Sequence, residues 1–296
     1  MRNRRTDLAL EARELWQESA GKTTRLPGVE ARDDVREGFP VTTVRILDQQ
    51  GQQALGKPPG SYITLTLDGL LRREEDAFGR AVRALAAELT SLLPQALPDA
   101  PVLVAGLGNR AITPDAIGPQ VHEHTLVTRH LVAQMPEHFG ALRPVVSLAT
   151  GVLGTTGMES GELVQSLCRS LHPAYVIAVD ALASRSLQRL CRTVQLADTG
   201  ITPGSGVGNH RFALTRESLG VPVIAIGVPT VVEAATLAAD LMDAEDLPDL
   251  GAGKDLLVTP KDIDSQVRDL SKVIAYAIGL ALQPALTLND LDMLLN

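Results

Sequence analysis

The stretch from Pro101 to Pro119, PVLVAGLGNRAITPDAIGP, constrains the fold of this chain more than any other. It begins with an almost unbroken apolar run over residues 102–105, which is typical of a strand buried on both faces. The run ends at Gly106-Leu107-Gly108-Asn109, where the glycines permit a sharp turn or a close backbone approach. Thr113-Pro114-Asp115 then has the order of an N-cap, a first helical proline and a first-turn acid. The pattern predicts a strand, a turn and a helix start, with Asp115 near the carboxyl end of a central strand, where sites form in open α/β sheets.

Further strand and helix patterns alternate along the chain. Strands are predicted at residues 41–46, 62–67, 144–148, 174–179, 193–196 and 221–227, and helices at 8–18, 73–93, 121–131, 163–171, 230–241 and 267–282. Residues 21–38 and 51–60 read as loops, and a further helix is expected to open at 181–185. The alternation predicts an α/β fold with a mainly parallel sheet flanked by helices, and an N-terminal β-hairpin and helix as an extension.

Prolines after the helix at 73–93 mark a boundary before the central strand. We therefore expect residues 8–98 to form the N-terminal extension and residues 99–296 to form the α/β core. A chain of 296 residues is long enough to bury a sizeable core, and the two parts are expected to make one compact domain.

Charge and composition exclude several classes of function. The formal charge of −8 argues against direct nucleic-acid binding, and an aromatic content of 3% argues against a stacking surface for bases. Cys168 and Cys191 lack metal or redox spacing and read as buried thiols in a reducing compartment. The N-terminus has no secretory signal and no apolar run is long enough to cross a bilayer, so we expect a cytoplasmic protein without membrane contact.

Nucleotide binding and the common hydrolase chemistries find little support. Residues 106–111 fit a relaxed dinucleotide pattern, but the expected ribose-binding acid would fall near residues 128–130, which contain no carboxylate. Serine-nucleophile, zinc and P-loop motifs are absent from the sequence. We expect neither a cofactor nor a metal.

A pair of acids carries the sharper signal. Asp115 and Asp180 each follow a buried apolar strand, and parallel strands place both acids at one edge of the sheet. Two neighbouring carboxylates share a proton, so one can activate water while the other protonates a leaving group. The structural alternatives are a helix-dipole acid for Asp115 and an N-cap for Asp180. Their shared edge favours function.

Other polar residues are candidates for supporting roles. The candidates are Asn109, Arg129, His130, Glu159 and Arg185. Each has an ordinary alternative, such as a solvated loop acid, a hydrogen-bonded structural histidine or a salt-bridging arginine. The glycine-rich loop over residues 199–211 could bind an anion, form an oxyanion-stabilising wall or only make a tight turn.

Ordered motifs along nearly the whole chain resemble the germination protease family, the endopeptidases that degrade small acid-soluble spore proteins when bacterial spores germinate. The matching motifs are RTDLALEA from Arg5, LGKPPGSYITL from Leu55, GLGN and TPDAIGP within 106–119, TRHL from Thr128, GTTGME from Gly154, VDALASR from Val179, DTGITPGSGVGNHR from Asp198, GVPVIAIGVPTVV from Gly220 and VTPKDID from Val258.

The resemblance implies an atypical aspartic-type endopeptidase with a fold distantly similar to hydrogenase maturation proteases. The two essential aspartates of the family fall on Asp115 and Asp180. The resemblance also implies a homotetramer in the spore core, with small acid-soluble spore proteins as substrates, made as an inactive precursor that removes its own N-terminal segment. Family substrates are cut between an acid and an apolar residue, so we expect residues 1–7 to be a propeptide cut between Asp7 and Leu8.

Two departures and two rival functions stay open. Seven residues make a short leader for blocking a cleft, and Thr150 stands where the family tends to have proline. One rival is a protease like the hydrogenase maturation enzymes, whose acids recognise a metal on the substrate. The other is a non-catalytic binding or scaffold protein whose aspartates only cap helices.

Overall fold

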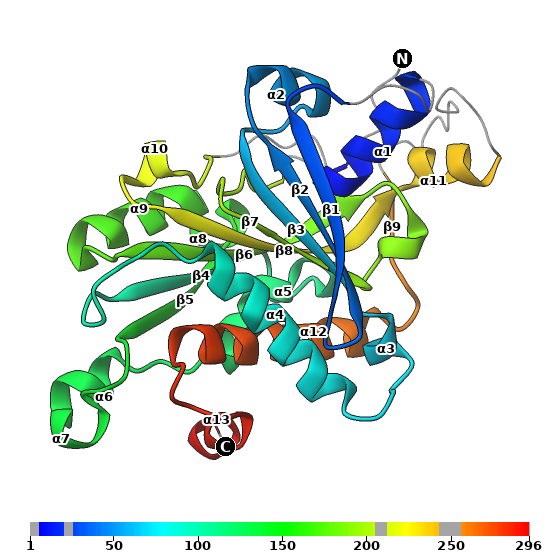
Figure 1. Cartoon of the computed structure of the whole chain (residues 1–296). Helices are drawn as coiled ribbons and strands as arrows, with labels where there is room; N and C mark the ends of the chain where they lie inside the picture. The colour runs from blue at the N-terminus through cyan, green and yellow to red at the C-terminus, as the bar shows by residue number, and fades with distance from the viewer. Residues whose placement is uncertain (1–5, 21–25, 205–211, 243–255, 296) are drawn as a thin grey trace.

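The computed structural model describes residues 6–20, 26–204, 212–242 and 256–295, and these residues form one continuous twisted sheet with helices on both faces (Figure 1). At its centre four strands run parallel, in the spatial order β5 (Val145–Gly151), β4 (Val102–Leu107), β6 (Tyr175–Ser184) and β8 (Val223–Glu233). The side chains of β4 are buried on both faces, which is why its sequence is apolar without alternation. The parallel centre flanked by helices confirms the predicted fold class.

Antiparallel strands extend the sheet beyond β8. They are β7 (Thr193–Ala197), β3 (Gly60–Thr66), β2 (Phe39–Ile46) and β1 (Val29–Arg36), with β9 (Leu257–Val258) pairing to the far end of β8. β2 and β3 pair as predicted. The N-terminal extension joins the core sheet directly, because β3 pairs with β7 at Ile63 and Leu196.

Two segments predicted as loops contain regular structure. β1 lies within residues 21–38, where its sequence VEARDDVR is exposed almost throughout and gives no apolar alternation to read. The segment 51–60 contributes most of α2 (Gln49–Leu55). Asp48 caps this helix, because its Oδ1 accepts hydrogen bonds from the N–H groups of Gln50 and Gly51 at 2.9 and 3.0 Å.

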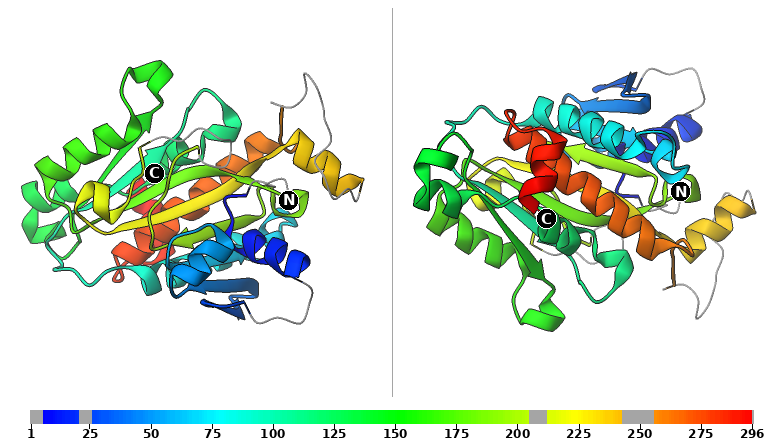
Figure 2. Two further views of the ribbon diagram at one scale, coloured as in Figure 1. Left: turned by 90° about the horizontal axis from the view of Figure 1, so that it is seen from above. Right: turned by 90° about the horizontal axis from the view of Figure 1, so that it is seen from below.

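Helices cover both faces of the sheet. One face carries α4 (Ala77–Leu92), α5 (Ile117–His124) and α12 (Ile263–Leu282), and the other carries α9 (Ser160–Leu171) and α10 (Arg216–Leu219). α4 and α12 lie side by side across the sheet (Figure 2), and the rings of Phe78 and Tyr276 meet edge to face at 5.5 Å between them. α1 (Ala9–Ala20) packs against the extension strands through Ala9, Ala12 and Trp16.

The remaining helices are short. They are α3 (Asp68–Leu71), η1 (Thr113–Asp115), α6 (Arg129–Gln134), α7 (Pro136–Phe139), α8 (Leu153–Thr156), η2 (Leu187–Arg189), α11 (Ala234–Leu241) and α13 (Leu288–Leu295). The single helix predicted over 121–131 is therefore wrong. The chain turns extended at Thr125, and Thr128 anchors the following residues to β5 by accepting the N–H of Val145 at 2.9 Å. Among the described helices, none is both long and apolar enough to span a bilayer.

Candidate active site

The glycine turn after β4 sets the position of Asp115. Gly108 has φ +110°, a conformation that favours glycine, and the chain then makes the single 3-10 turn of η1, which ends at Asp115. The Oδ2 atom of Asp115 accepts the backbone N–H of Asn109 at 2.8 Å, which closes the turn. The predicted N-cap role of Thr113 is wrong, because its hydroxyl instead donates to Asp264 on α12 at 2.7 Å and α5 begins only at Ile117.

Asp180 lies inside β6 and not at the start of a helix. The predicted helix at 181–185 is wrong, because β6 continues to Ser184 and pairs with the long strand β8 up to that residue. β4 is shorter: its Gly106 pairs with Val179, so Asp180 is the first β6 residue beyond that pairing. Asp180 is 5% exposed, and its Oδ1 accepts the N–H of Ala181 at 2.9 Å.

Asp115 and Asp180 line one cavity, which we call the site cavity. Its volume is about 370 Å³, and its wall includes residues from the β4 turn, from β6 and from β8. Thr230 of β8 lines it too, and the Thr230 hydroxyl donates to the carbonyl of Pro114 at 2.7 Å, which ties η1 to the sheet. The structure thus brings together the two acids that the sequence singled out.

A third aspartate reaches the same cavity from the N-terminus. Asp7 lines the site cavity and contacts the end of β6. Its N–H donates to the carbonyl of Ala183 at 3.0 Å, and the N–H of Ala183 donates to Asp7 Oδ2 at 2.9 Å. The next residue, Leu8, is fully buried. The bond between Asp7 and Leu8, predicted from the sequence as a cleavage site, therefore begins at a residue that lines the same cavity as the two acids.

The supporting candidates divide by position. Asn109 belongs to the site through its hydrogen bond to Asp115. His130 and Arg129 are exposed on α6, and Glu159 precedes α9, where its N–H donates to Glu162 at 3.3 Å. None of these three is among the described residues that line the site cavity.

Arg185 lies at another contact, and part of the glycine-rich loop lines the cavity. The backbone N–H of Arg185 donates to Glu11 at 2.7 Å, which places Arg185 at the contact between β6 and α1. Of the glycine-rich loop, Pro203 and Gly204 line the cavity wall, whereas residues 205–211 lie outside the described residues.

A second cavity of about 280 Å³ adjoins the first, and we call it the lysine cavity. Asp7 and Leu182 line both cavities, and Lys57, Tyr62 and Gln195 line only the second. Burial lowers the pKa of Lys57, and the carboxylates of Asp7 and Glu11 oppose that shift. Burial also raises the pKa of Tyr62 to about 12, and the Tyr62 hydroxyl accepts a hydrogen bond from Thr199 at 3.2 Å.

Sequence reasoning did not assign Lys57 or Gln195 to the site. Gln195 gives one local signal, since it is a polar residue in the apolar strand TVQLA, where its side chain is buried. Lys57 lies in the irregular LGKPPG segment and gives none. Within the described part of the chain, no cluster of three or more His, Cys, Asp or Glu side chains is arranged to hold a metal ion.

Comparisons with known proteins place this chain in a family. A sequence model of the germination protease family matches residues 9–251. The chain is 44% identical to the germination protease of Caldanaerobacter subterraneus subsp. tengcongensis, over 99% of this chain and 98% of that protein. It is 42% identical to that of Clostridium perfringens over the full length of both, and 36% identical to that of Bacillus cereus over 94% and 93%. Among solved structures, a NiFe hydrogenase maturation protease from Thermococcus kodakarensis KOD1 matches 65% of this chain and 99% of its own, with 18% identity and a TM-score of 0.37.

The sequence and these relatives define a protease. More particularly, the chain belongs to the germination protease family.

Proposed function

We propose that this chain is an aspartic-type endopeptidase in which Asp115 and Asp180 act on one water molecule. The observation that carries the proposal is that these two acids, supplied by different elements, line one cavity. Neighbouring carboxyl groups favour a state in which one is ionised and the other protonated. The ionised group takes a proton from water as the water oxygen attacks the peptide carbonyl, and the protonated group gives its proton to the leaving amine.

The contacts of the two acids support a catalytic pair over a scaffold with helix caps. One oxygen of each carboxylate accepts a backbone N–H, from Asn109 for Asp115 and from Ala181 for Asp180. Such bonds orient a carboxylate without neutralising it. Asp180 cannot serve as an N-cap, because it lies within a strand.

The proposed substrates are small acid-soluble spore proteins, and the proposed setting is the spore core during germination. The support is family membership over nearly the whole chain, with relatives that are named germination protease. A protease that recognises a metal on its substrate is the alternative reading. A chelator distinguishes the two functions, because only the metal-recognising protease would lose its activity when a chelator is added.

The chain is further proposed to be a precursor that cuts itself between Asp7 and Leu8. The support is positional, because Asp7 lines the cavity that contains both acids and is held there by two hydrogen bonds to Ala183. A segment held in this way excludes other substrates until it is cut and leaves. Intact-mass measurement under activating conditions would show the loss of residues 1–7, and a chain that keeps them while cleaving substrate would contradict the proposal.

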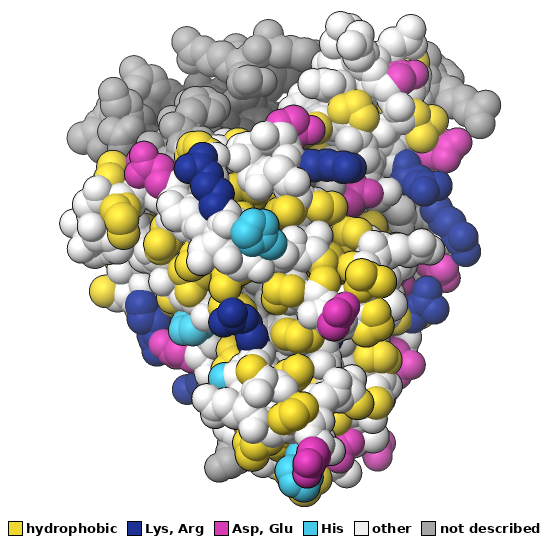
Figure 3. Space-filling view, turned by 90° about the vertical axis from the view of Figure 1, so that its left-hand side faces the viewer, with side chains coloured by type: hydrophobic (Ala, Val, Ile, Leu, Met, Phe, Trp, Pro, Cys, Tyr) yellow, Lys and Arg dark blue, Asp and Glu magenta, His cyan; other side chains and the backbone are white. Residues whose placement is uncertain are grey.

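Assembly as a homotetramer is also proposed from the family resemblance. Hydrophobic side chains gather in the middle of one face of the molecule, between scattered charged groups (Figure 3). A face of this kind can be covered by another copy of the chain. Light scattering on the purified protein tests the assembly, and a monomer at micromolar concentration would contradict it.

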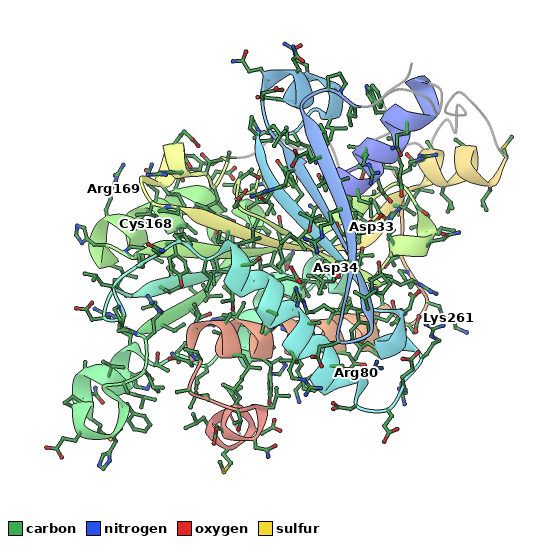
Figure 4. The ribbon with its side chains drawn as sticks, viewed as in Figure 1. Asp33, Asp34, Arg80, Cys168, Arg169 and Lys261 are labelled. Atoms are coloured by element: carbon green, nitrogen blue, oxygen red, sulfur yellow. The ribbon has the colours of Figure 1, made fainter. Side chains whose placement is uncertain are left out.

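Asp115→Asn and Asp180→Asn test the catalytic pair. Asparagine keeps an oxygen that can accept the backbone N–H but cannot act as a base or an acid. Each variant should cleave an acid-soluble spore protein about 10²- to 10⁴-fold more slowly than the wild type, with an unchanged circular dichroism spectrum and melting temperature. Asp33→Asn, on exposed strand β1 (Figure 4), is the matched control and should cleave normally. A near-normal rate in either site variant overturns the proposal.

A further inference from the structure

The contacts of Asp7 suggest how the site recognises the chain that it cuts. Asp7 lies at the junction of the site cavity and the lysine cavity, with Asp115 and Asp180 on one side and Lys57 and Gln195 on the other. Asp7 therefore shares one cavity with the two acids and a second cavity with basic and polar side chains. This arrangement resembles a substrate held across its scissile bond.

We propose that Lys57, together with the backbone N–H of Ala183, selects an acidic residue on the amino side of the cleaved bond, and that Gln195 fixes the backbone around that bond. The inference rests on the proposed endopeptidase function and adds the residues that determine its specificity. The ligand class is a peptide with an aspartate or glutamate at that position.

The carboxylate of Asp7 accepts one directed hydrogen bond, and a cation lines the same cavity. The N–H of Ala183 donates to Oδ2 at 2.9 Å, so this oxygen is held by the same strand that carries Asp180. The cation is Lys57, a half-buried lysine in the wall of the lysine cavity. Burial lowers the pKa of Lys57, whereas Asp7 and Glu11 raise it. An acid placed beside Lys57 therefore stabilises its charged form.

Glu11 is not the acid whose place a substrate would take. Glu11 is already engaged, because it accepts the N–H groups of Arg185 and Ser186 at 2.7 and 3.0 Å and pairs with Arg189 at 3.2 Å. It also follows the proposed cut and stays in the protein. Of these two acids, Asp7 alone would leave on cleavage, and its position could then be filled by the acid of an incoming substrate.

Gln195 contacts the backbone on both sides of the Asp7–Leu8 bond. Its Nε2 donates to the carbonyl oxygen of Asp7 at 3.2 Å, and its Oε1 accepts the N–H of Ala9 at 2.8 Å. The Asp7 carbonyl belongs to the peptide bond that would be cut. The Gln195 amide thus binds main-chain groups, which every peptide has. It therefore contributes to binding without selecting a particular side chain.

The test compares two peptides that span residues 5–12, one with the natural aspartate and one with asparagine at the position of Asp7. The enzyme is the full chain after its own processing, and kcat/KM is measured by mass spectrometry of the products. The wild type should prefer the aspartate peptide by about 10- to 100-fold, as expected for a charge-assisted contact. Lys57→Met should reduce this preference to about twofold by slowing the aspartate peptide alone, and Lys57→Arg should keep most of it.

The matched control is Lys272→Met, which removes a half-buried lysine on α12 that lines neither cavity. It should leave the preference unchanged. Gln195→Met should slow both peptides about equally, by about tenfold, because it removes bonds to the main chain. The ratio of the two peptides is insensitive to partial unfolding, since both are cut by the same folded fraction.

Two results would overturn the inference while leaving the endopeptidase intact. One is a Lys57→Met enzyme that keeps the wild-type preference or slows both peptides alike. The other is a Gln195→Met enzyme as fast as the wild type on both peptides. A wild-type chain that cleaves neither peptide nor itself would instead show that the proposed function has failed, and the inference would fail with it.

Discussion

Gly108 lies so close to Asp115 that a Cβ atom built on Gly108 would stand 2.1 Å from the Asp115 carbonyl oxygen and 2.9 Å from Oδ1. Both residues belong to the turn that leaves β4. The short distance and the φ of +110° make glycine a requirement at this position, because any side chain would push η1 away from the sheet. The glycine thus determines where the catalytic candidate Asp115 sits.

Gly108→Ala should therefore lower both stability and activity. The left-handed backbone and the clash should destabilise the protein by about 1–3 kcal/mol, and a displacement of Asp115 by about 1 Å should slow cleavage by about 10²-fold. Urea unfolding and cleavage of a spore protein measure the two effects. Gly154→Ala is the control, because that glycine has ordinary φ and open space around its Cα. Equal behaviour of the two variants would contradict the prediction.

Glu11→Gln should loosen α1 from the core. The Glu11 side chain is almost fully buried and accepts the N–H groups of Arg185 and Ser186, so an amide there would point a donor at other donors. We expect a loss of about 1–3 kcal/mol in the free energy of unfolding. The sole tryptophan, Trp16, lies on the same helix and reports its release by fluorescence during urea unfolding.

Glu14→Gln is the matched control for the preceding change. The Glu14 side chain is 40% exposed and pairs with Arg189, which also pairs with Glu11. Loss of the Glu14 charge should therefore change stability by no more than about 1 kcal/mol. If the two variants unfold at the same urea concentration, the buried contacts of Glu11 do not anchor the helix.

The parallel centre of the fold and the acid pair could be predicted because each depends on local sequence. The apolar runs before Asp115 and near Asp180 identify buried strands, and parallel strands must bring their carboxyl ends to one edge. The prediction ended β6 too early. β6 continues through ALAS because the long β8 pairs with it, which no local pattern in either segment reveals.

The rest of the site depends on contacts between distant segments. Asp7 contacts Ala183 and Gln195, which lie 176 and 188 residues further along the chain. β1 cannot be predicted from its sequence for a similar reason. Backbone hydrogen bonds pair it with β2, and its side chains are almost all exposed, so they show no apolar alternation. Long-range pairing of this kind leaves little trace in residue order.

The two cysteines should be unreactive in the folded protein. Cys168 on α9 (Figure 4) and Cys191 are both free and buried. Burial raises both pKa values, that of Cys191 to about 12, so little thiolate is present at pH 8. Iodoacetamide should add no mass to the native chain within an hour and two adducts after denaturation. Native labelling as fast as denatured labelling would contradict the burial of these thiols.

His124 should make the fold less stable in acid. Burial, followed by the charge of Lys272, lowers the pKa of His124 below its ordinary value near 6.5, with Glu123 opposing the shift. Between the folded and unfolded pKa values the unfolded chain binds more protons, so stability falls as pH drops below about 6.5 and the penalty is complete below the folded pKa. His124→Gln removes this titration. Its stability relative to the wild type, measured by urea unfolding at steps from pH 7 to pH 5, should therefore rise as the pH falls. A difference that stays constant over that range would show that His124 does not contribute to acid sensitivity.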